Sequence, residues 1–174
     1  MNLSSWENWD KLDIKTSYFI LDQSEKKLDA TIETAKILSD RAIILMQSSS
    51  GILIALLGYA ATTKERELLF QLSVLLIAFC IAIFLLSFRV YNLYEIRVKG
   101  NSPSNLISNE KVNYVKQELR FTYGEIVTIG DSIDYNERNN LVRASALRLA
   151  ITTITILVFT LPLYSILWYL LCRL

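Results

Sequence analysis

The sequence has no histidine, only two cysteines and a formal net charge of +1 at pH 7. The absence of histidine removes the usual general base near neutral pH and the commonest metal ligand. The cysteines, Cys80 and Cys172, stand alone in apolar segments, where we expect them to pack as small apolar side chains without a zinc or redox role. A near-zero charge gives no bulk attraction to nucleic acid. An enzyme is therefore the least favoured class, and we expect no catalytic residue, metal or cofactor.

Long apolar runs are what the sequence has instead, since 52% of its 174 residues are hydrophobic. A helix that crosses about 30 Å of hydrocarbon needs about 20 apolar residues, because each residue adds about 1.5 Å. Three segments meet this length, at residues 42–62, 68–88 and 149–172. The sequence therefore predicts an all-α membrane protein with three transmembrane helices, in contact with membrane lipid and with long helical cytoplasmic extensions.

The basic residues between these spans predict the topology. Residues 1–41 and 89–148 hold 15 of the 18 Lys and Arg, whereas residues 63–67 form a short loop and residues 173–174 a short tail. With three spans, the two basic segments share one side of the membrane, and the positive-inside rule makes that side cytoplasmic. Residues 1–41 are polar and do not read as a signal peptide, so the first span is expected to insert the chain and to be retained. The expected location is the plasma membrane, with the loop and the tail outside.

The spans are expected to continue as helices into the cytoplasm. Apolar residues in 18–41 recur at helical spacing, and no glycine or proline separates them from the first span, so one long helix is predicted. Residues 89–100 are expected to prolong the second helix as far as Gly100, followed by a turn at 101–105. Trp6 and Trp9 either dock at the membrane interface or pack on the protein.

The clearest pattern lies between the second and third spans. Apolar or small side chains alternate at spacings of three and four for three heptads, at Val112, Val115, Leu119, Thr122, Ile126, Ile129 and Ile133. This stripe is expected to pack either in an antiparallel hairpin on the N-terminal helix or between subunits. Gly124 and Gly130 lie outside the stripe and each weakens a helix by about 1 kcal/mol, so a break is predicted near Gly130–Asp131.

The first span contains the polar stretch QSSSG at residues 47–51. A stripe of small or polar residues recurs there at intervals of four, four and three, at Gln47, Gly51, Ala55 and Gly58. Such a stripe is costly against lipid, so it either packs inside a three-helix bundle or lines a pore between identical subunits. None of the spans holds an ionisable residue, which disfavours a proton- or ion-coupled transporter.

Basic and amide side chains of the 89–148 segment form a candidate ligand site. The candidates are Lys111, Lys116, Arg120, Arg138, Asn139, Arg143 and Arg148, with Asn136 and Asn140 beside them. Guanidinium, ammonium and amide donors bind phosphate oxygens, although the same residues also suit a position near lipid headgroups, with glutamates as local partners. The sequence has no glycine-rich phosphate loop.

The organisation resembles that of small bacterial membrane effectors of anti-phage defence. Residues 25–61 look like the entry helix of those effectors, with the sequence EKKLDATIETAKILSDRAIILMQSSSGILIALLGYAA. A third span after a cytoplasmic helical segment is more similar to the effectors of cyclic-pyrimidine (Pycsar) systems than to SLATT-type effectors, and a DNA-gated effector of the Hailong type fits the same layout.

This resemblance implies an oligomer that forms a pore or disrupts the membrane potential under control of a nucleotide-derived ligand. The ligand would be a cyclic nucleotide or an oligonucleotide made by a neighbouring enzyme. A homo-oligomer, with a tetramer favoured, is also expected because three spans with one polar stripe make a poor channel alone. The alternative is a structural or regulatory membrane subunit that binds a partner through the 112–133 stripe.

The topology predicts which engineered cysteines are accessible from outside the cell. A cysteine at Thr63 should react with an impermeant maleimide on intact cells, because the loop faces out. A cysteine at Asn101 should react only after permeabilisation, because the central segment is cytoplasmic. The measurement is gel-shift labelling of each variant, and the reverse accessibility would contradict the three-span arrangement.

Overall fold

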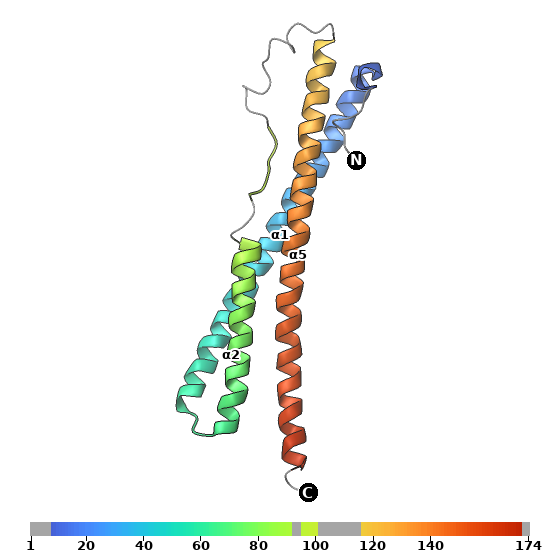
Figure 1. The fold of residues 1–174 in the computed structure, drawn as a ribbon. Coiled ribbons are helices and arrows are strands. Elements are labelled where there is room, and N and C mark those ends of the chain that lie inside the picture. The colour runs from blue at the N-terminus through green and yellow to red at the C-terminus, as the bar shows by residue number, and fades with distance from the viewer. Residues whose placement is uncertain (1–7, 92–94, 101–115, 172–174) are drawn as a thin grey trace. The chain divides into compact units, whose positions relative to one another are not determined.

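A computed structural model gives the fold of the chain and describes residues 8–91, 95–100 and 116–171. The described residues form helices and no strand, so the predicted all-α class is confirmed. In chain order the elements are the 3-10 helix η2 (Trp9–Lys11), helix α1 (Ile14–Thr62), helix α2 (Arg66–Leu86), the π-helical turn η3 (Ser87–Tyr91) and helix α5 (Gln117–Leu171) (Figure 1).

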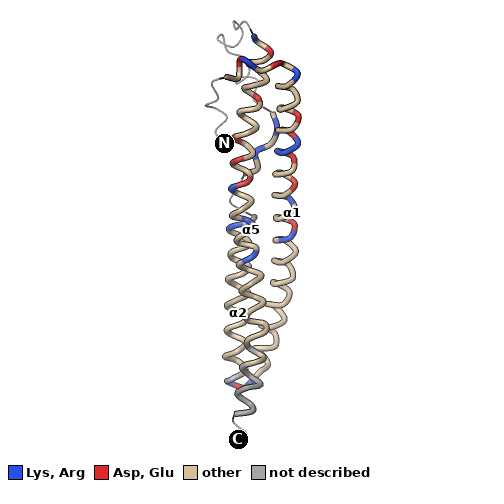
Figure 2. Tube along the Cα trace, turned by 90° about the vertical axis from the view of Figure 1, so that its right-hand side faces the viewer, with Lys and Arg blue, Asp and Glu red and all other residues tan. Residues whose placement is uncertain are grey.

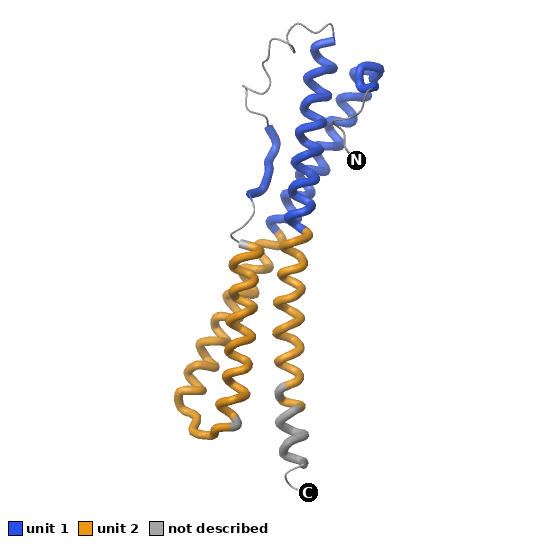
Figure 3. The backbone as a smooth tube through the Cα atoms, viewed as in Figure 1, with its two compact units in different colours: residues 1–36, 95–140 blue, residues 37–94, 141–174 orange. Residues whose placement is uncertain are grey.

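The chain divides into two compact units (Figure 3). Unit 1 comprises residues 1–36 and 95–140, and unit 2 comprises residues 37–94 and 141–174. Helices α1 and α5 contribute to both units, whereas α2 belongs to unit 2. Charged residues gather on the unit 1 parts of α1 and α5 and are sparse along the unit 2 parts (Figure 2). The polar and the apolar halves of these two long helices thus coincide with the two units.

Unit 1 is held by α1 and α5, which lie side by side and run in the same direction. Tyr18 of α1 donates a hydrogen bond to Glu118 near the start of α5, and Thr31, further along α1, contacts Asn136, further along α5. The expected antiparallel hairpin is therefore wrong in direction, although the packing partner is the N-terminal helix. The reason is connectivity: α2 and η3 lie between α1 and α5 along the chain, so no tight turn joins the two helices into a hairpin.

The seam between the two helices follows a heptad spacing on both of them. The buried seam residues of unit 1 are Ser17, Leu28, Thr31 and Ala35 on α1, and Leu119, Thr122, Ile126, Ile129, Asn136 and Asn140 on α5. Ile133 is half-buried in the same register, and Val112 and Val115 lie outside the described residues. Spacings of three and four place these side chains on one helix face, as in a coiled coil. The described part of the predicted stripe is thus buried or half-buried inside the chain.

Helix α5 is continuous through Gly124 and Gly130, so the predicted break near Gly130–Asp131 is wrong. Ile126 and Ile129 on one side and Ser132 on the other are buried, and this packing offsets the glycine cost of about 1 kcal/mol each. The Ser132 hydroxyl also donates to the Thr128 carbonyl at 2.9 Å, one turn earlier. Tertiary packing therefore outweighs the local helix propensity.

Helix α2 does not continue to Gly100 as predicted. It ends at Leu86, passes into the π-helical turn η3, and residues 95–100 are not helical. Backbone groups of this segment bond to a side chain of α5 instead of to their own helix, as described below. Gly100 has a φ of 104°, a conformation that favours glycine, and it ends the described part of the segment.

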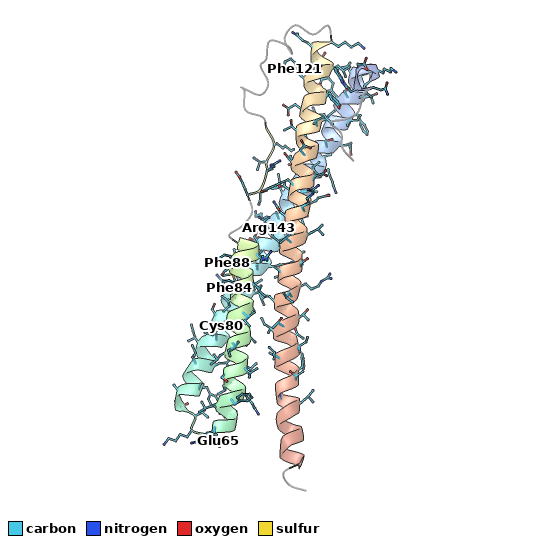
Figure 4. The ribbon with its side chains drawn as sticks, viewed as in Figure 1. Glu65, Cys80, Phe84, Phe88, Phe121 and Arg143 are labelled. Carbon is cyan, nitrogen blue, oxygen red and sulfur yellow. The ribbon has the colours of Figure 1, made fainter. Side chains whose placement is uncertain are left out.

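Unit 2 has a small core built mainly from small side chains. The buried cluster comprises Ala42, Ala82, Leu86, Val90, Ala146, Leu147 and Ala150, from all three helices. Small residues let helices approach closely in an apolar environment. Phe84 of α2 and Phe88 of η3 lie outside this core, with ring centres 4.9 Å apart (Figure 4). Cys80 is exposed, so it does not pack inside the chain as predicted, and Cys172 lies outside the described residues.

Three helices are long and apolar enough to cross a membrane, at Ile14–Thr62, Leu68–Val90 and Gln117–Thr160. In their most apolar 18-residue windows, only 11%, 22% and 22% of the residues are buried. Large apolar side chains such as Ile54, Phe70 and Phe159 are 69%, 71% and 68% exposed. Water does not favour so continuous an apolar surface, whereas hydrocarbon does. The structure agrees in this respect with the predicted multi-pass membrane protein.

Candidate functional site

Buried polar side chains cluster in unit 1, on the seam between α1 and α5. Thr31 of α1 and Asn136 and Asn140 of α5 are 5%, 2% and 7% exposed. The Asn140 amide donates to the Thr31 carbonyl at 2.8 Å, and the Asn136 amide donates to Thr31 Oγ1 at 3.3 Å. Buried polar groups are costly unless they are hydrogen-bonded, so these pairs disfavour any other register of the two helices.

Asn136 also binds the backbone of residues 95–100. Its Oδ1 accepts a hydrogen bond from the Arg97 amide at 3.0 Å, and its Nδ2 donates to the Arg97 carbonyl at 2.9 Å. An asparagine amide offers a donor and an acceptor in one plane, so it pairs with a backbone much as a neighbouring strand does. The Arg97 guanidinium lies over the Tyr135 ring, 4.2 Å from its centre, in a cation–π contact.

Lys99 extends the same attachment to α1. Its Nζ lies 2.6 Å from the Asp29 carboxylate and 3.5 Å from the Glu25 carboxylate. The pKa of Lys99 lies above its ordinary 10.5, chiefly because of the hydrogen bond to Asp29, with attraction from both carboxylates adding and desolvation opposing. This contact therefore stabilises the fold fully below about pH 10.5 and is lost as the pH rises through the raised pKa.

The predicted ligand residues near the start of α5 are already engaged. Lys116 donates to the Asp10 carbonyl at 2.6 Å, and Arg120 lies 5.6 Å from the centre of the Trp9 ring. A cleft of about 360 Å³ beside Lys116 is also lined by Asp13 and Glu118, whose carboxylates disfavour a phosphate. Lys111 lies outside the described residues.

Trp9 packs on the protein, which was one of its two expected roles. Its ring stacks on Tyr123 of α5 with centres 5.1 Å apart and planes 13° apart. This stacking fastens η2, at the N-terminal end of the described chain, to the start of α5 within unit 1. Trp6 lies outside the described residues.

The remaining predicted ligand residues do not form one surface. Arg138 and Arg148 are exposed, whereas Asn139 is 9% and Arg143 3% exposed. Arg143 is labelled on α5 in Figure 4. Arg138 and Arg143 are five residues apart, which places them well over a quarter-turn apart around the helix. Lys116 and Arg138 are separated by 22 residues of one helix, or roughly 33 Å along its axis. The structure therefore does not bring together the six predicted residues that it describes.

The small-residue stripe of α1 lies on an open face of unit 2. Gln47, Gly51, Ala55 and Gly58 are all exposed, and an added Cβ at either glycine would meet no atom within 4 Å. The middle serine of QSSSG behaves differently, since Ser49 is 1% exposed and lies on the seam spacing that includes Ala42. The polar stretch thus serves two faces: Ser49 points into the chain, and the stripe points away from it.

Sequence reasoning missed the contacts that join the polar cluster to residues 95–100. The heptad spacing gave a usable signal, because the steps of three and four continue beyond Ile133 to Asn136, Asn140 and Arg143 and then to Leu147 and Ala150. Following spacing instead of hydrophobicity would have placed the asparagines on the seam. Their partners Thr31 and the Arg97 backbone leave no comparable pattern in the sequence.

Comparisons with protein-family models, with curated proteins and with solved structures give no match for this chain. Among the described residues, no group of three or more Asp, Glu or Cys side chains is placed to hold a metal ion. What the cluster does chemically is hold backbone and side chains together.

Adjacent asparagines provide a test of these hydrogen bonds. Asn140→Ala should lower the free energy of unfolding by about 1 kcal/mol, because the Thr31 carbonyl loses its interhelical donor. Asn139→Ala is the matched control and should cost less, because the buried Asn139 Nδ2 has no hydrogen-bond partner. The measurement is thermal unfolding in mild detergent, and equal losses for both variants would contradict the assignment.

Proposed function

We propose that this chain is a subunit of a homo-oligomeric membrane effector of bacterial anti-phage defence. In this proposal, several copies, with a tetramer favoured, sit in the inner membrane and change its permeability when a nucleotide-derived ligand binds. The observation that carries the proposal is the open face of α1, where the small-residue stripe has no packing partner in its own unit.

The stripe favours contact with other copies because it suits close helix packing. Glycine and alanine let two helix backbones approach, and a glutamine at one end hydrogen-bonds across the contact at about 0.6–2 kcal/mol. The packing of unit 2 instead uses the opposite face of α1, at Ala42 and Ser49. Identical stripes from several copies would meet around a common axis. Gln47 would then supply a polar side chain to the path through the membrane.

The burial of the seam weakens the alternative function. Leu119, Ile126 and Ile129 are 5%, 3% and 6% exposed within one chain. A partner protein would have to displace α1 to reach these three residues. They therefore do not favour binding of a separate protein, or subunit assembly, through this part of the stripe.

The ligand assignment is supported by the resemblance to nucleotide-controlled effectors and by the exposed basic residues. Arg138 and Arg148 are exposed on α5 and are accessible to a phosphate group. The buried Arg143 is not accessible in this conformation. A ligand that needed both Arg138 and Arg143 would have to bind a different arrangement of the helix.

Membrane placement is supported by a groove in unit 2 with a volume of about 680 Å³. Helices α1, α2 and α5 all contribute to its lining, which is apolar apart from Gln71 and includes Leu56, Phe79 and Pro162. In water such a groove would be costly to leave open, whereas in a membrane hydrocarbon fills it. This feature agrees with a hydrocarbon environment for unit 2.

The substitution Gly51→Leu tests assembly through the stripe. A Cβ added at Gly51 meets no described atom within 4 Å, so insertion and abundance should stay unchanged. Overpacking at a helix contact between copies costs about 1–3 kcal/mol, so the fraction of assembled protein should change by roughly fivefold or more. The measurements are oligomer mass in native detergent extracts and a potential-sensitive dye in cells that produce the cognate signal.

Leu57→Trp is the control for this experiment. Leu57 is exposed on the same helix and lies about a third of a turn from the centre of the stripe, so added bulk there should leave assembly and permeability as in the wild type. If Gly51→Leu also behaved like the wild type in both assays, the stripe would be neither a pore lining nor a tight interface, and the proposal would fail.

A further inference from the structure

One side chain in unit 1 contacts three separate stretches of the chain. Asn136 sits on α5, its amide donates to Thr31 on α1, and it pairs with both backbone groups of Arg97. Both hydrogens of its amide nitrogen and one lone pair of its oxygen are used in these bonds. The residue is 2% exposed, so its bonds lie away from solvent.

Each of these three stretches is joined along the chain to a different apolar helix. Helix α1 continues from Thr31 into its own apolar part, and α5 continues from Asn136 into the last one. Residues 95–100 follow α2 and η3, separated from them by residues 92–94 alone. Asn136 therefore bonds to the connecting segments of all three candidate membrane spans.

We propose that Asn136 is a latch that fastens residues 95–100 to α1 and α5 and that its release is a regulatory step of the protein. The proposal rests on the proposed function only in taking the fastened form as the resting state of the effector. Fastened, the three connecting segments are held to one another at one point. Released, the segment that follows α2 is free to move independently of α1 and α5.

The other contacts of residues 95–100 are weaker fastenings. The Lys99 side chain is 39% exposed and its partners Glu25 and Asp29 are 44% and 58% exposed, and exposed ion pairs contribute little to stability. Arg97 is itself exposed where it lies over Tyr135. The buried amide of Asn136 is thus the strongest attachment of this segment among the described contacts.

The exposure of the segment makes release feasible. Arg97, Val98 and Lys99 are exposed, so their backbone groups gain water as soon as they leave Asn136. The Asn136 amide keeps one bond, to Thr31, when the segment departs. Two states of similar free energy are what a ligand needs in order to shift a population, because it only has to stabilise one of them.

Limited proteolysis of the full-length protein in native membranes tests the latch. Trypsin cleaves after Arg97 and after Lys99 only when the segment leaves its site, because a protease needs a free extended backbone. Asn136→Ala removes the two hydrogen bonds to Arg97, so cleavage at these two bonds should become roughly tenfold faster. Mass spectrometry of the products measures it, and hydrogen exchange at the Arg97 amide should accelerate in parallel.

Asn139→Ala is the matched control, because Asn139 is also buried and lies on the same turn but makes no bond to the segment. A charge-swap pair avoids the buried amide altogether and remains informative if Asn136→Ala unfolds the unit. Lys99→Asp should speed cleavage after Arg97, and the addition of Asp29→Lys should slow it again. Cleavage after Arg97 that matches the wild type in Asn136→Ala and in Lys99→Asp would overturn the latch.

A potential-sensitive dye in cells separates this inference from the proposed function. We expect Asn136→Ala to change the permeability seen with the cognate signal, while Ser132→Ala does not, because the buried Ser132 hydroxyl donates to the Thr128 carbonyl of its own helix. Faster cleavage in Asn136→Ala with unchanged permeability would overturn the regulatory role of the latch. The proposed function would then still be judged by Gly51→Leu, whose position in unit 2 takes no part in the latch.

Discussion

The structure depends on the seam between α1 and α5, along which both helices keep a spacing of three and four residues. The spacing persists while the chemistry of the seam changes, from Ile126 and Ile129 to Asn136 and Asn140 and then to Leu147 and Ala150. Apolar layers supply most of the free energy of burial. They do not fix the register, because they tolerate a shift of one helix against the other by one heptad. The polar layer fixes the register of the two helices, because Thr31 can bond to Asn136 and Asn140 in only one register.

The same layer explains why the segment after α2 is not helical. A helical backbone would satisfy its own groups, but the Arg97 amide and carbonyl are satisfied by Asn136 instead. The seam therefore fixes two relationships at once: the register of α1 against α5, and the place at which the returning chain joins them. Such a shared contact suits a protein that responds to a signal, because one change in bonding alters both the helix register and the attachment of the segment after α2.

The sequence predicted the architecture well where apolar periodicity determines it. The three apolar helices, the unbroken α1 and the stripe from Leu119 to Ile129 all follow from spacing and hydrophobicity. The break near Gly130 was wrong because helix propensity is weaker than packing on both sides of the glycine. The end of α2 could not be judged from sequence, because a backbone partner such as Arg97 is set by tertiary contacts. The separation of Arg138 from Arg143 could have been, because residues five apart on one helix do not share a face.

Disulfide scanning along α1 tests the central claim, that identical copies meet through the open face of this helix. Single cysteines from residue 47 to residue 58 would be oxidised in native membranes after both native cysteines, Cys80 and Cys172, are changed to serine. The account predicts cross-linked dimers that peak at Gln47, Gly51, Ala55 and Gly58 and are minimal at Ser49, which faces into the chain. Cross-linking with no helical period, or with its peak on the face of Ser49, would contradict it.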